Sequence, residues 1–353
     1  MKNYIYSTLH LFKVDGEIIF FAPLGNGHIN STYICETDTK HKYVLQKINN
    51  NVFKDVKLLM NNYYEVTRFL LDNGFESIEL IKTIDNNIYT ENFETPYRLY
   101  KYIDYTVCFE KIDDLKIIYK CAQSYGIFHK ALKKFDASKL GEVIPNFHNT
   151  KQRYLNLLDA INLDKCNRKQ DCLPEIETIK SFEKEFDKIV SLLGSKELPL
   201  EVVHNDPKIN NVLFDDETKD FRAIIDLDTI MPGSYLYDFG DALRSLFTGD
   251  NEDNEDLSLL KVNYEIFDAY AKGYLSVMKK VLTKKEKELL AFSSFLLTIE
   301  CGMRFLEDYL RGDVYFKTVK EKHNLVRART QITLACDIYK NLNKLDEIAN
   351  KYF

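Results

Sequence analysis

His204-Asn205-Asp206-Pro207-Lys208-Ile209-Asn210-Asn211 is a short polar segment between two apolar ones. Residues 200–203 before it and 212–214 after it are strand-like, so we expect a polar loop held between two short buried strands. The spacing H-x-D-x-x-x-x-N places a carboxylate and an amide oxygen in one loop. Phosphoryl transfer needs a carboxylate to accept the proton of the attacking hydroxyl, and oxygen ligands for magnesium. The segment therefore predicts a kinase catalytic loop, with Asp206 as the base and Asn211 as a metal ligand.

The residues after this loop predict a β-hairpin. Residues 212–214 and 221–227 are strand-like, and the six residues between them are polar. If the turn is centred near Thr218, Asn211 and Asp226 face each other with Cβ atoms roughly 5 Å apart. One amide oxygen and one carboxylate are hard ligands of the kind that magnesium takes from proteins. The hairpin predicts that these two side chains share one ion; the alternative is a turn with polar residues at its base.

A second metal-binding pattern occurs downstream, because Asp238-Phe239-Gly240 has the letters of the magnesium-binding triplet of protein kinases. It lies outside the hairpin and opens a segment with apolar residues at helical spacing. Asp238 is therefore expected either to cap that helix, with Asp241 three residues on, or to hold the backbone of the catalytic loop. His204 and Asp238 are both assigned to the support of the loop.

Composition limits the classes of function. The 353 residues suffice for two domains, and 45% hydrophobic with 29% charged residues is an ordinary globular balance. A net charge of −6 without a basic stripe argues against nucleic-acid binding and favours small-molecule chemistry. Seven scattered cysteines without a C-x-x-C pair predict neither a disulfide framework nor a zinc site. No apolar run is long enough to span a bilayer, so we expect a cytoplasmic protein without a membrane partner. The oligomeric state is not indicated.

The pattern along the chain predicts an α+β fold with two lobes. Residues 18–48 alternate as strands, residues 52–72 have helical spacing, and strand character returns at 97–100. Beyond residue 103 the pattern is mainly helical, interrupted by strands only at 200–228. We therefore expect a β-rich nucleotide-binding lobe over residues 1–103, and a helical lobe with the catalytic loop and substrate site over 104–353.

Two features of the first lobe could bind nucleotide phosphates. Gly25 and Gly27 stand in a turn between strands, where backbone can approach a phosphate closely, although such a turn is often only a hairpin connection. Lys47 follows on a strand, as the nucleotide-binding lysine of protein kinases does. If the strand register slips by one residue, Gln46 and not Lys47 occupies the nucleotide-binding position. Glu65 on the next helix could pair with Lys47.

Taken together, these residues resemble the aminoglycoside phosphotransferase and choline kinase superfamily, whose fold is protein-kinase-like. Within it they are similar to the bacterial N-acetylhexosamine 1-kinases, over nearly the whole chain. Asn61 stands where family members often carry an acidic residue, which leaves the partner of Lys47 open. Besides the loop, the segments that carry the resemblance are VLQKIN at 44–49, VFKD at 52–55, IPNFHNT at 144–150, IDLDT at 225–229, DFGD at 238–241, RFLEDYL at 304–310, GDVYF at 312–316 and HNL at 323–325.

The resemblance implies ATP- and magnesium-dependent phosphorylation of the anomeric C1 hydroxyl of GlcNAc or GalNAc, with Asp206 at the sugar. It implies that Asp228 assists the metal or binds a sugar hydroxyl. Lys208 would meet the charge of the transferring phosphoryl group. Arg304 and Tyr315 would reach the sugar. For Arg304 an ion pair with Glu300, four residues before it, is an equal alternative, and Tyr315 could instead belong to the core.

Three alternatives remain open from the sequence. A kinase of the same superfamily could act on choline, homoserine, methylthioribose or an aminoglycoside, because the loop does not separate these acceptors. A protein kinase is disfavoured, since the glycine-rich loop is incomplete and no A-P-E segment follows Asp226. A catalytically inactive nucleotide-binding regulator is the third, and the intact Asp206, Asn211 and Asp226 argue against it.

Overall fold

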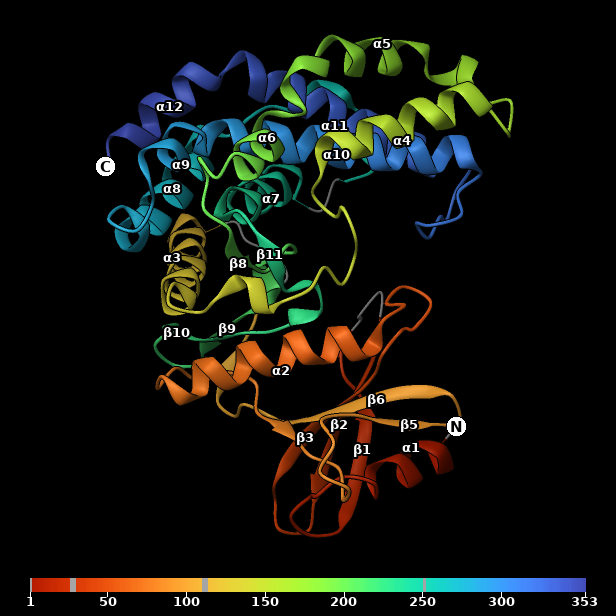
Figure 1. Ribbon diagram of the computed structural model, residues 1–353, viewed down its shortest axis with the longest axis vertical. Helices are drawn as coiled ribbons and strands as arrows, with labels where there is room; N and C mark the ends of the chain where they lie inside the picture. Colours follow the sequence, from red (N-terminus) through yellow and green to blue (C-terminus); the bar gives the residue numbers. More distant parts are fainter. Residues whose placement is uncertain (1, 26–29, 110–113, 250–251) are drawn as a thin grey trace. The chain divides into compact units, whose positions relative to one another are not determined.

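The computed structural model describes residues 2–25, 30–109, 114–249 and 252–353. The chain forms two compact units, and each is assembled from several segments. The first contains Met1–Cys108, Lys134–Ile144 and Val212–Met231; the second contains Phe109–Lys133, Pro145–Asn211 and Pro232–Phe353. The first unit holds most of the strands and the second holds most of the helices, which confirms the predicted α+β fold (Figure 1).

The first unit is built on an antiparallel sheet in the order β1-β2-β3-β6-β4, with β5 paired to β6. The strands predicted near 18–21, 32–35 and 43–45 are confirmed. The bounds of the elements are α1 (Lys2–Leu9), β1 (Ile18–Pro23), β2 (Ser31–Thr37), β3 (Lys42–Lys47), α2 (Val56–Asp72), β4 (Leu80–Ile81), β5 (Thr90–Asn92) and β6 (Thr95–Lys101).

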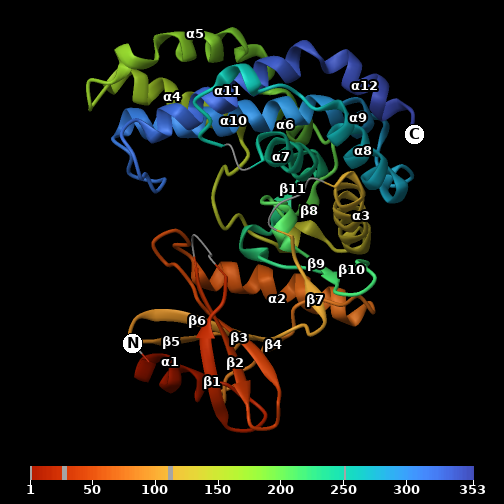
Figure 2. The ribbon, with the colours of Figure 1, turned by 180° about the vertical axis from the view of Figure 1, so that it is seen from behind.

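The two faces of this sheet carry different side chains because strand residues alternate between faces. Leu45 and Leu99 pack with Ile5 and Leu9 of α1, which forms an apolar cluster on one face. Helix α2 runs along the sheet (Figures 1 and 2). Gln46 and Arg98, the strand neighbours of Leu45 and Leu99, lie on the face toward α2, where the Arg98 guanidinium lies over the Tyr63 ring. The buried positions of α2 recur at helical spacing: Leu59, Met60, Asn62, Tyr63, Val66, Thr67 and Leu70.

The predicted hairpin is present as β9 (Val212–Asp215) and β10 (Phe221–Ile224), and β7 (Thr106–Val107) pairs with β9. Its register differs from the symmetric prediction: Phe214 is opposite Phe221, and beyond an irregularity between Phe221 and Ala223, Val212 is opposite Ile224 and not residue 225. The second strand also ends earlier than expected. Asp226 has φ of +60°, which a continuing strand cannot adopt, and a 3₁₀ turn follows at Leu227–Thr229. Asp226 is therefore a turn residue and not a ladder residue.

The second unit is a helical assembly around α10, which packs against α4, α7 and α11, while α3 packs on α8. Figure 2 shows α10 running through the layer of long helices. No helix in the described part of the chain is both long and apolar enough to cross a bilayer. The bounds are α3 (Leu115–Leu132), α4 (Thr150–Leu163), α5 (Leu173–Ser181), α6 (Lys188–Gly194), β8 (Glu201–Val203), β11 (Met231–Gly233), α7 (Tyr235–Thr248), α8 (Tyr264–Met278), α9 (Lys284–Glu288), α10 (Leu290–Arg311), α11 (His323–Lys340) and α12 (Leu342–Asn350).

Candidate active site

The polar loop 204–211 begins directly after the buried strand β8 and ends in a 3₁₀ turn before β9, as its flanking residues predicted. His204 and Asn205 are buried, whereas the Asp206 side chain is 28% exposed. The loop therefore presents its central carboxylate and hides its first two side chains. Such an arrangement suits a base that must meet a hydroxyl from solution.

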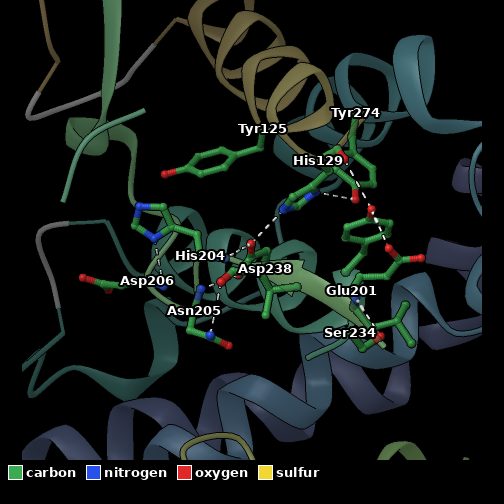
Figure 3. Close-up of polar contacts among 12 residues, drawn as sticks. Tyr125, His129, Glu201, His204, Asn205, Asp206, Ser234, Asp238 and Tyr274 are labelled. Carbon is green, nitrogen blue, oxygen red and sulfur yellow. Dashed lines mark hydrogen bonds and ion pairs between the residues drawn. The ribbon is translucent and has the colours of Figure 1, made fainter. Parts of the chain in front are cut away.

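Asp238 fixes the backbone immediately before Asp206. The N–H groups of His204 and Asn205 donate to its two carboxylate oxygens, both at 2.7 Å (Figure 3). These are the contacts expected of a residue that holds the loop, whereas the expected capping role was wrong. Helix α7 starts earlier than expected, and Ser234 caps it by accepting the N–H of Leu236.

The rest of the Asp238-Phe239-Gly240 triplet serves packing. Phe239 is fully buried in the core of the helical unit. A Cβ added at Gly240 would overlap the Ser293 carbonyl of α10, so glycine is needed where the two helices meet. The triplet is therefore explained by the support of the loop and by helix contact.

His129 on α3 is a support that the sequence did not reveal. Its Nε2 lies 2.8 Å from Asp238 Oδ2, and its Nδ1 lies 3.0 Å from the Tyr274 hydroxyl (Figure 3). Burial opposes ionisation of Asp238, but the hydrogen bond and charge of His129 hold the pKa of this carboxyl below its ordinary value. An ionised Asp238 can accept several donors, which strengthens its grip on the loop backbone.

Lys208 is paired with the predicted base. Its Nζ lies 3.0 Å from Asp206 Oδ1, and the carboxylate raises the pKa of this lysine. The backbone of Lys208 is fixed as well, because its carbonyl accepts the Tyr125 hydroxyl at 2.7 Å and its N–H donates to the Asp206 carbonyl at 2.8 Å. A positioned cation beside the base could neutralise charge on a transferring phosphoryl group.

Asn211 closes the loop onto itself. Its Nδ2 donates to the Asp206 carbonyl at 2.9 Å, and its own N–H donates to the Lys208 carbonyl at 3.1 Å. The nitrogen end of the amide is thereby committed, which leaves the oxygen end for a cation. An amide oxygen is a hard ligand of the kind that magnesium takes from proteins. Its predicted partner Asp226 belongs to the other compact unit, so the sharing of one ion stays a prediction. Within the described residues, no three His, Cys, Asp or Glu side chains gather as a metal site.

Asp228, predicted as a further metal or sugar ligand, is buried with both carboxylate oxygens engaged. Oδ1 forms an ion pair with Arg98 Nη1, and Oδ2 accepts the Asn30 side-chain nitrogen. Burial opposes the charge of Arg98, yet the carboxylate of Asp228 raises the pKa of this guanidinium. The structure therefore places Asp228 in a buried charge pair, and its role at a metal or sugar stays a prediction.

Arg98 is the centre of this cluster on the α2 face of the sheet. Its Nε and Nη2 both donate to Gln46 Oε1, at 2.8 and 2.7 Å, and its guanidinium lies 4.2 Å from the centroid of the Tyr63 ring. Gln46 in turn donates to Thr32 at 3.2 Å. Arg98 was not predicted as a site residue from the sequence, although a charged residue within the apolar strand YRLY at 97–100 indicates a buried partner.

The predicted nucleotide ligands are placed as follows. Gly25 has φ of +69°, and a Cβ added there would meet no atom within 4 Å, while Gly27 lies outside the described residues. Lys47 is exposed at the end of β3, on the face opposite to Gln46. Within the described ranges Lys47 makes no ion pair, so the expected pairing with Glu65, itself exposed on α2, is not observed.

The predicted acceptor residues lie on α10 and the loop that follows it. The Arg304 guanidinium lies between two rings, 5.2 Å from the centroid of Phe147 and 5.5 Å from that of Phe316. Tyr315 is 59% exposed, so it is not a core residue. The alternative ion pair with Glu300 is also not found in the described structure, because Glu300 binds other partners.

His148 connects this region to the catalytic loop. Its Nδ1 lies 2.7 Å from Glu300 Oε1, and its Nε2 lies 3.3 Å from the Asn205 carbonyl. Glu300 and Arg304 are one helical turn apart on the same face of α10. Helix α10 is therefore linked through one buried histidine to the residue that precedes Asp206. His148 was not assigned a role from the sequence.

An accessible carboxylate beside a lysine, on a loop clamped within a kinase-like two-unit fold, defines a phosphotransferase that acts on a hydroxyl of a small molecule. The chain belongs to the phosphotransferase enzyme family, whose model matches residues 21–274.

Solved structures share the fold at low sequence identity. An aminoglycoside phosphotransferase from Alicyclobacillus acidocaldarius has a TM-score of 0.60 at 11% identity, with 96% of each chain covered. An amicoumacin kinase in complex with AMP-PNP, Ca²⁺ and Ami has a TM-score of 0.61 at 10% identity, covering 95% of this chain and 93% of that one. A choline kinase from Cryptosporidium parvum has a TM-score of 0.60 at 15% identity, covering 98% and 97%.

Proposed function

We propose that this protein is an ATP- and Mg²⁺-dependent kinase that phosphorylates the anomeric C1 hydroxyl of N-acetylhexosamines. Asp206 would orient the sugar hydroxyl and accept its proton, and Lys208 would stabilise charge on the phosphoryl group as it transfers. Asn211 and Asp226 would hold the Mg²⁺, which neutralises charge on the nucleotide phosphates. Gly25, Gly27 and Lys47 would contact the nucleotide. The amicoumacin kinase of similar fold binds AMP-PNP with Ca²⁺, which supports a nucleotide and a divalent cation.

The observation that carries the acceptor assignment is that the carboxylates on the helix of Arg304 already have partners within the protein. Glu300 is bound by His148 and Thr150, Glu307 pairs with Arg311 at 2.9 Å, and Asp308 accepts backbone N–H groups. These carboxylates are therefore satisfied by the protein. A cationic acceptor such as choline would need an aromatic cage or a carboxylate that is not already paired within the protein. A neutral sugar needs hydrogen-bond donors and aromatic faces, which Arg304, Tyr315 and the flanking rings provide.

The alternative is a kinase of the same family that acts on a cationic alcohol. The fold similarity to choline kinase and to aminoglycoside phosphotransferase favours it. The two proposals differ at Arg304, because a guanidinium in the acceptor region repels a cationic substrate and donates hydrogen bonds to a neutral one.

An acceptor panel tests the proposal. GlcNAc, GalNAc, glucose, galactose, choline and ethanolamine are each incubated with ATP and Mg²⁺, and ADP release is followed by a coupled assay. The phosphorylated position is then identified by ³¹P and ¹H NMR. We expect turnover with the N-acetylhexosamines and product at C1. Turnover with choline or ethanolamine and none with the sugars would refute the proposal, and Asp206→Asn serves as the inactive control.

A further inference from the structure

The loop after α10 changes direction sharply before it reaches the predicted acceptor residues. Gly312 has φ of +100° and Asp313 has φ of +60°, and the N–H of Gly312 closes the helix by donating to the Tyr309 carbonyl at 3.2 Å. The next three residues, Val314, Tyr315 and Phe316, then run past the end of the helix. Their backbone N–H groups find no acceptor among the backbone carbonyls of the helix that has just ended.

Asp308 satisfies these N–H groups from within the last turns of α10. Its Oδ1 accepts from Val314 at 2.9 Å and from Tyr315 at 2.8 Å, and its Oδ2 accepts from Phe316 at 2.9 Å. The Asn324 side chain donates to the same Oδ2 at 2.9 Å. The carboxylate is only 4% exposed. Four donors converge on one buried anion, and such charge-assisted hydrogen bonds are stronger than neutral ones.

The start of the loop is tied down independently. Asn324, fully buried on α11, uses its second amide hydrogen to bind Asp313 Oδ1 at 2.9 Å. The other oxygen of Asp313 forms an ion pair with Arg168. Asn324 therefore joins Asp308 of the helix to Asp313 of the loop, and the backbone from Asp313 onward is held at each residue.

This loop carries the side chains that surround Arg304. The Phe316 ring lies 4.5 Å from that of Phe305 and flanks the Arg304 guanidinium, and the Tyr315 ring lies 4.8 Å from that of Phe316. Tyr315 itself is mostly exposed, so packing alone does not fix it. Its position depends on a backbone N–H that Asp308 holds.

We propose that Asp308 is a positioning residue for acceptor binding: its carboxylate preorganises the 314–316 backbone so that Tyr315 and Phe316 form a fixed surface beside Arg304. The proposal rests on the proposed function in one respect, because it takes Arg304 and Tyr315 to contact the acceptor. A preorganised surface binds its ligand without first ordering a loop, so the loss of the carboxylate weakens acceptor binding.

The first test is a kinetic comparison of Asp308→Asn with a matched control. The variant keeps the size of the side chain but replaces one carboxylate oxygen with an amide NH₂. Each oxygen accepts two of the four donors, so two hydrogen bonds are lost. We expect KM for the acceptor to rise about tenfold, with KM for ATP within about twofold of the wild-type value. The control is Glu286→Gln on α9, a buried carboxylate that accepts the N–H and hydroxyl of Thr283 at 2.7 and 2.8 Å and does not contact the loop.

The second test measures the loop directly by hydrogen–deuterium exchange with the full-length protein. In the wild type the amides of 314–316 should be protected although the segment is exposed, and in Asp308→Asn their exchange should be at least about tenfold faster. If Asp308→Asn does not fold, Asn324→Ala removes one donor from Asp308 and one from Asp313, and should show the same changes to a smaller extent.

The outcomes separate this proposal from the proposed function. The wild-type acceptor panel decides the substrate, and the variants are then assayed with whichever acceptor the wild type uses. Asp308 is reduced to a structural residue if acceptor KM is unchanged, if acceptor KM and ATP KM rise together, or if Glu286→Gln raises acceptor KM as much as Asp308→Asn does. Fast exchange of the 314–316 amides in the wild type would also overturn the proposal.

Discussion

Arg98→Met tests whether the buried charge pair with Asp228 holds the β unit together. The substitution keeps an apolar stem against Tyr63 but removes the guanidinium, so the Asp228 carboxylate, 5% exposed, loses its counter-charge. Breaking one partner of a buried pair destabilises a protein by ~3–5 kcal/mol. Gln46 Oε1 also loses both of its donors, which adds to the loss. At 2–4 °C per kcal/mol, we expect Tm to fall by roughly 10 °C.

The measurement is differential scanning calorimetry or far-UV circular dichroism, because the chain contains no tryptophan for intrinsic fluorescence. Arg68→Met on α2 is the matched control: its pair with Asp72, at 3.4 Å, is exposed and should contribute under about 0.5 kcal/mol. The double variant Arg98→Met with Asp228→Asn removes both charges and should recover part of the lost stability. A Tm within about 2 °C of wild type for Arg98→Met alone, or a double variant as unstable as the sum of the single ones, would refute the reasoning.

Three further predictions concern the catalytic loop. Asp206→Asn should lower kcat by about 10²–10⁴-fold while calorimetry shows ATP affinity retained; near-normal turnover would contradict the assignment of the base. Asp226→Ala should abolish the difference in nucleotide affinity between Mg²⁺ and EDTA, and an intact difference would remove Asp226 from the metal site. Asp238→Asn should lower kcat by up to about 10²-fold through the loop backbone. Because the pKa of Asp238 is lowered in the folded state, its stabilisation is present above pH ~4 and is lost as pH falls further, so unfolding of the variant in acid should depend less on pH than that of the wild type.

Local patterns in the sequence predicted the elements well because they depend on near neighbours. Apolar alternation located β1, β2 and β3, helical spacing located α2 and α3, and the polar loop between apolar runs was found where expected. The errors came where one residue changed the geometry. The hairpin pairs Val212 with Ile224, one residue short of the prediction, and Asp226 has a left-handed backbone conformation that lies outside the strand.

The cluster around Asp228 could not be predicted in this way. It brings together Asn30, Gln46 and Arg98, which are separated along the chain by 198, 182 and 130 residues from Asp228. Only the packing of the sheet sets these distances, and no local period contains them. A charged residue inside an apolar strand indicates that a partner exists without saying which one.

Asp238 and Asp308 make the same kind of contact, and both residues can be recognised in the sequence. Each is an aspartate in a buried stretch of helix, and each accepts the N–H groups of successive loop residues with both carboxylate oxygens. Asp238 fixes the loop that carries Asp206, and Asp308 fixes the loop that carries Tyr315. A buried charge is unfavourable unless several donors surround it, and a row of backbone N–H groups provides those donors. An aspartate among apolar helical residues is therefore better interpreted as the anchor of a distant or following loop than as a helix cap, and the loop it holds is where reacting groups should be sought.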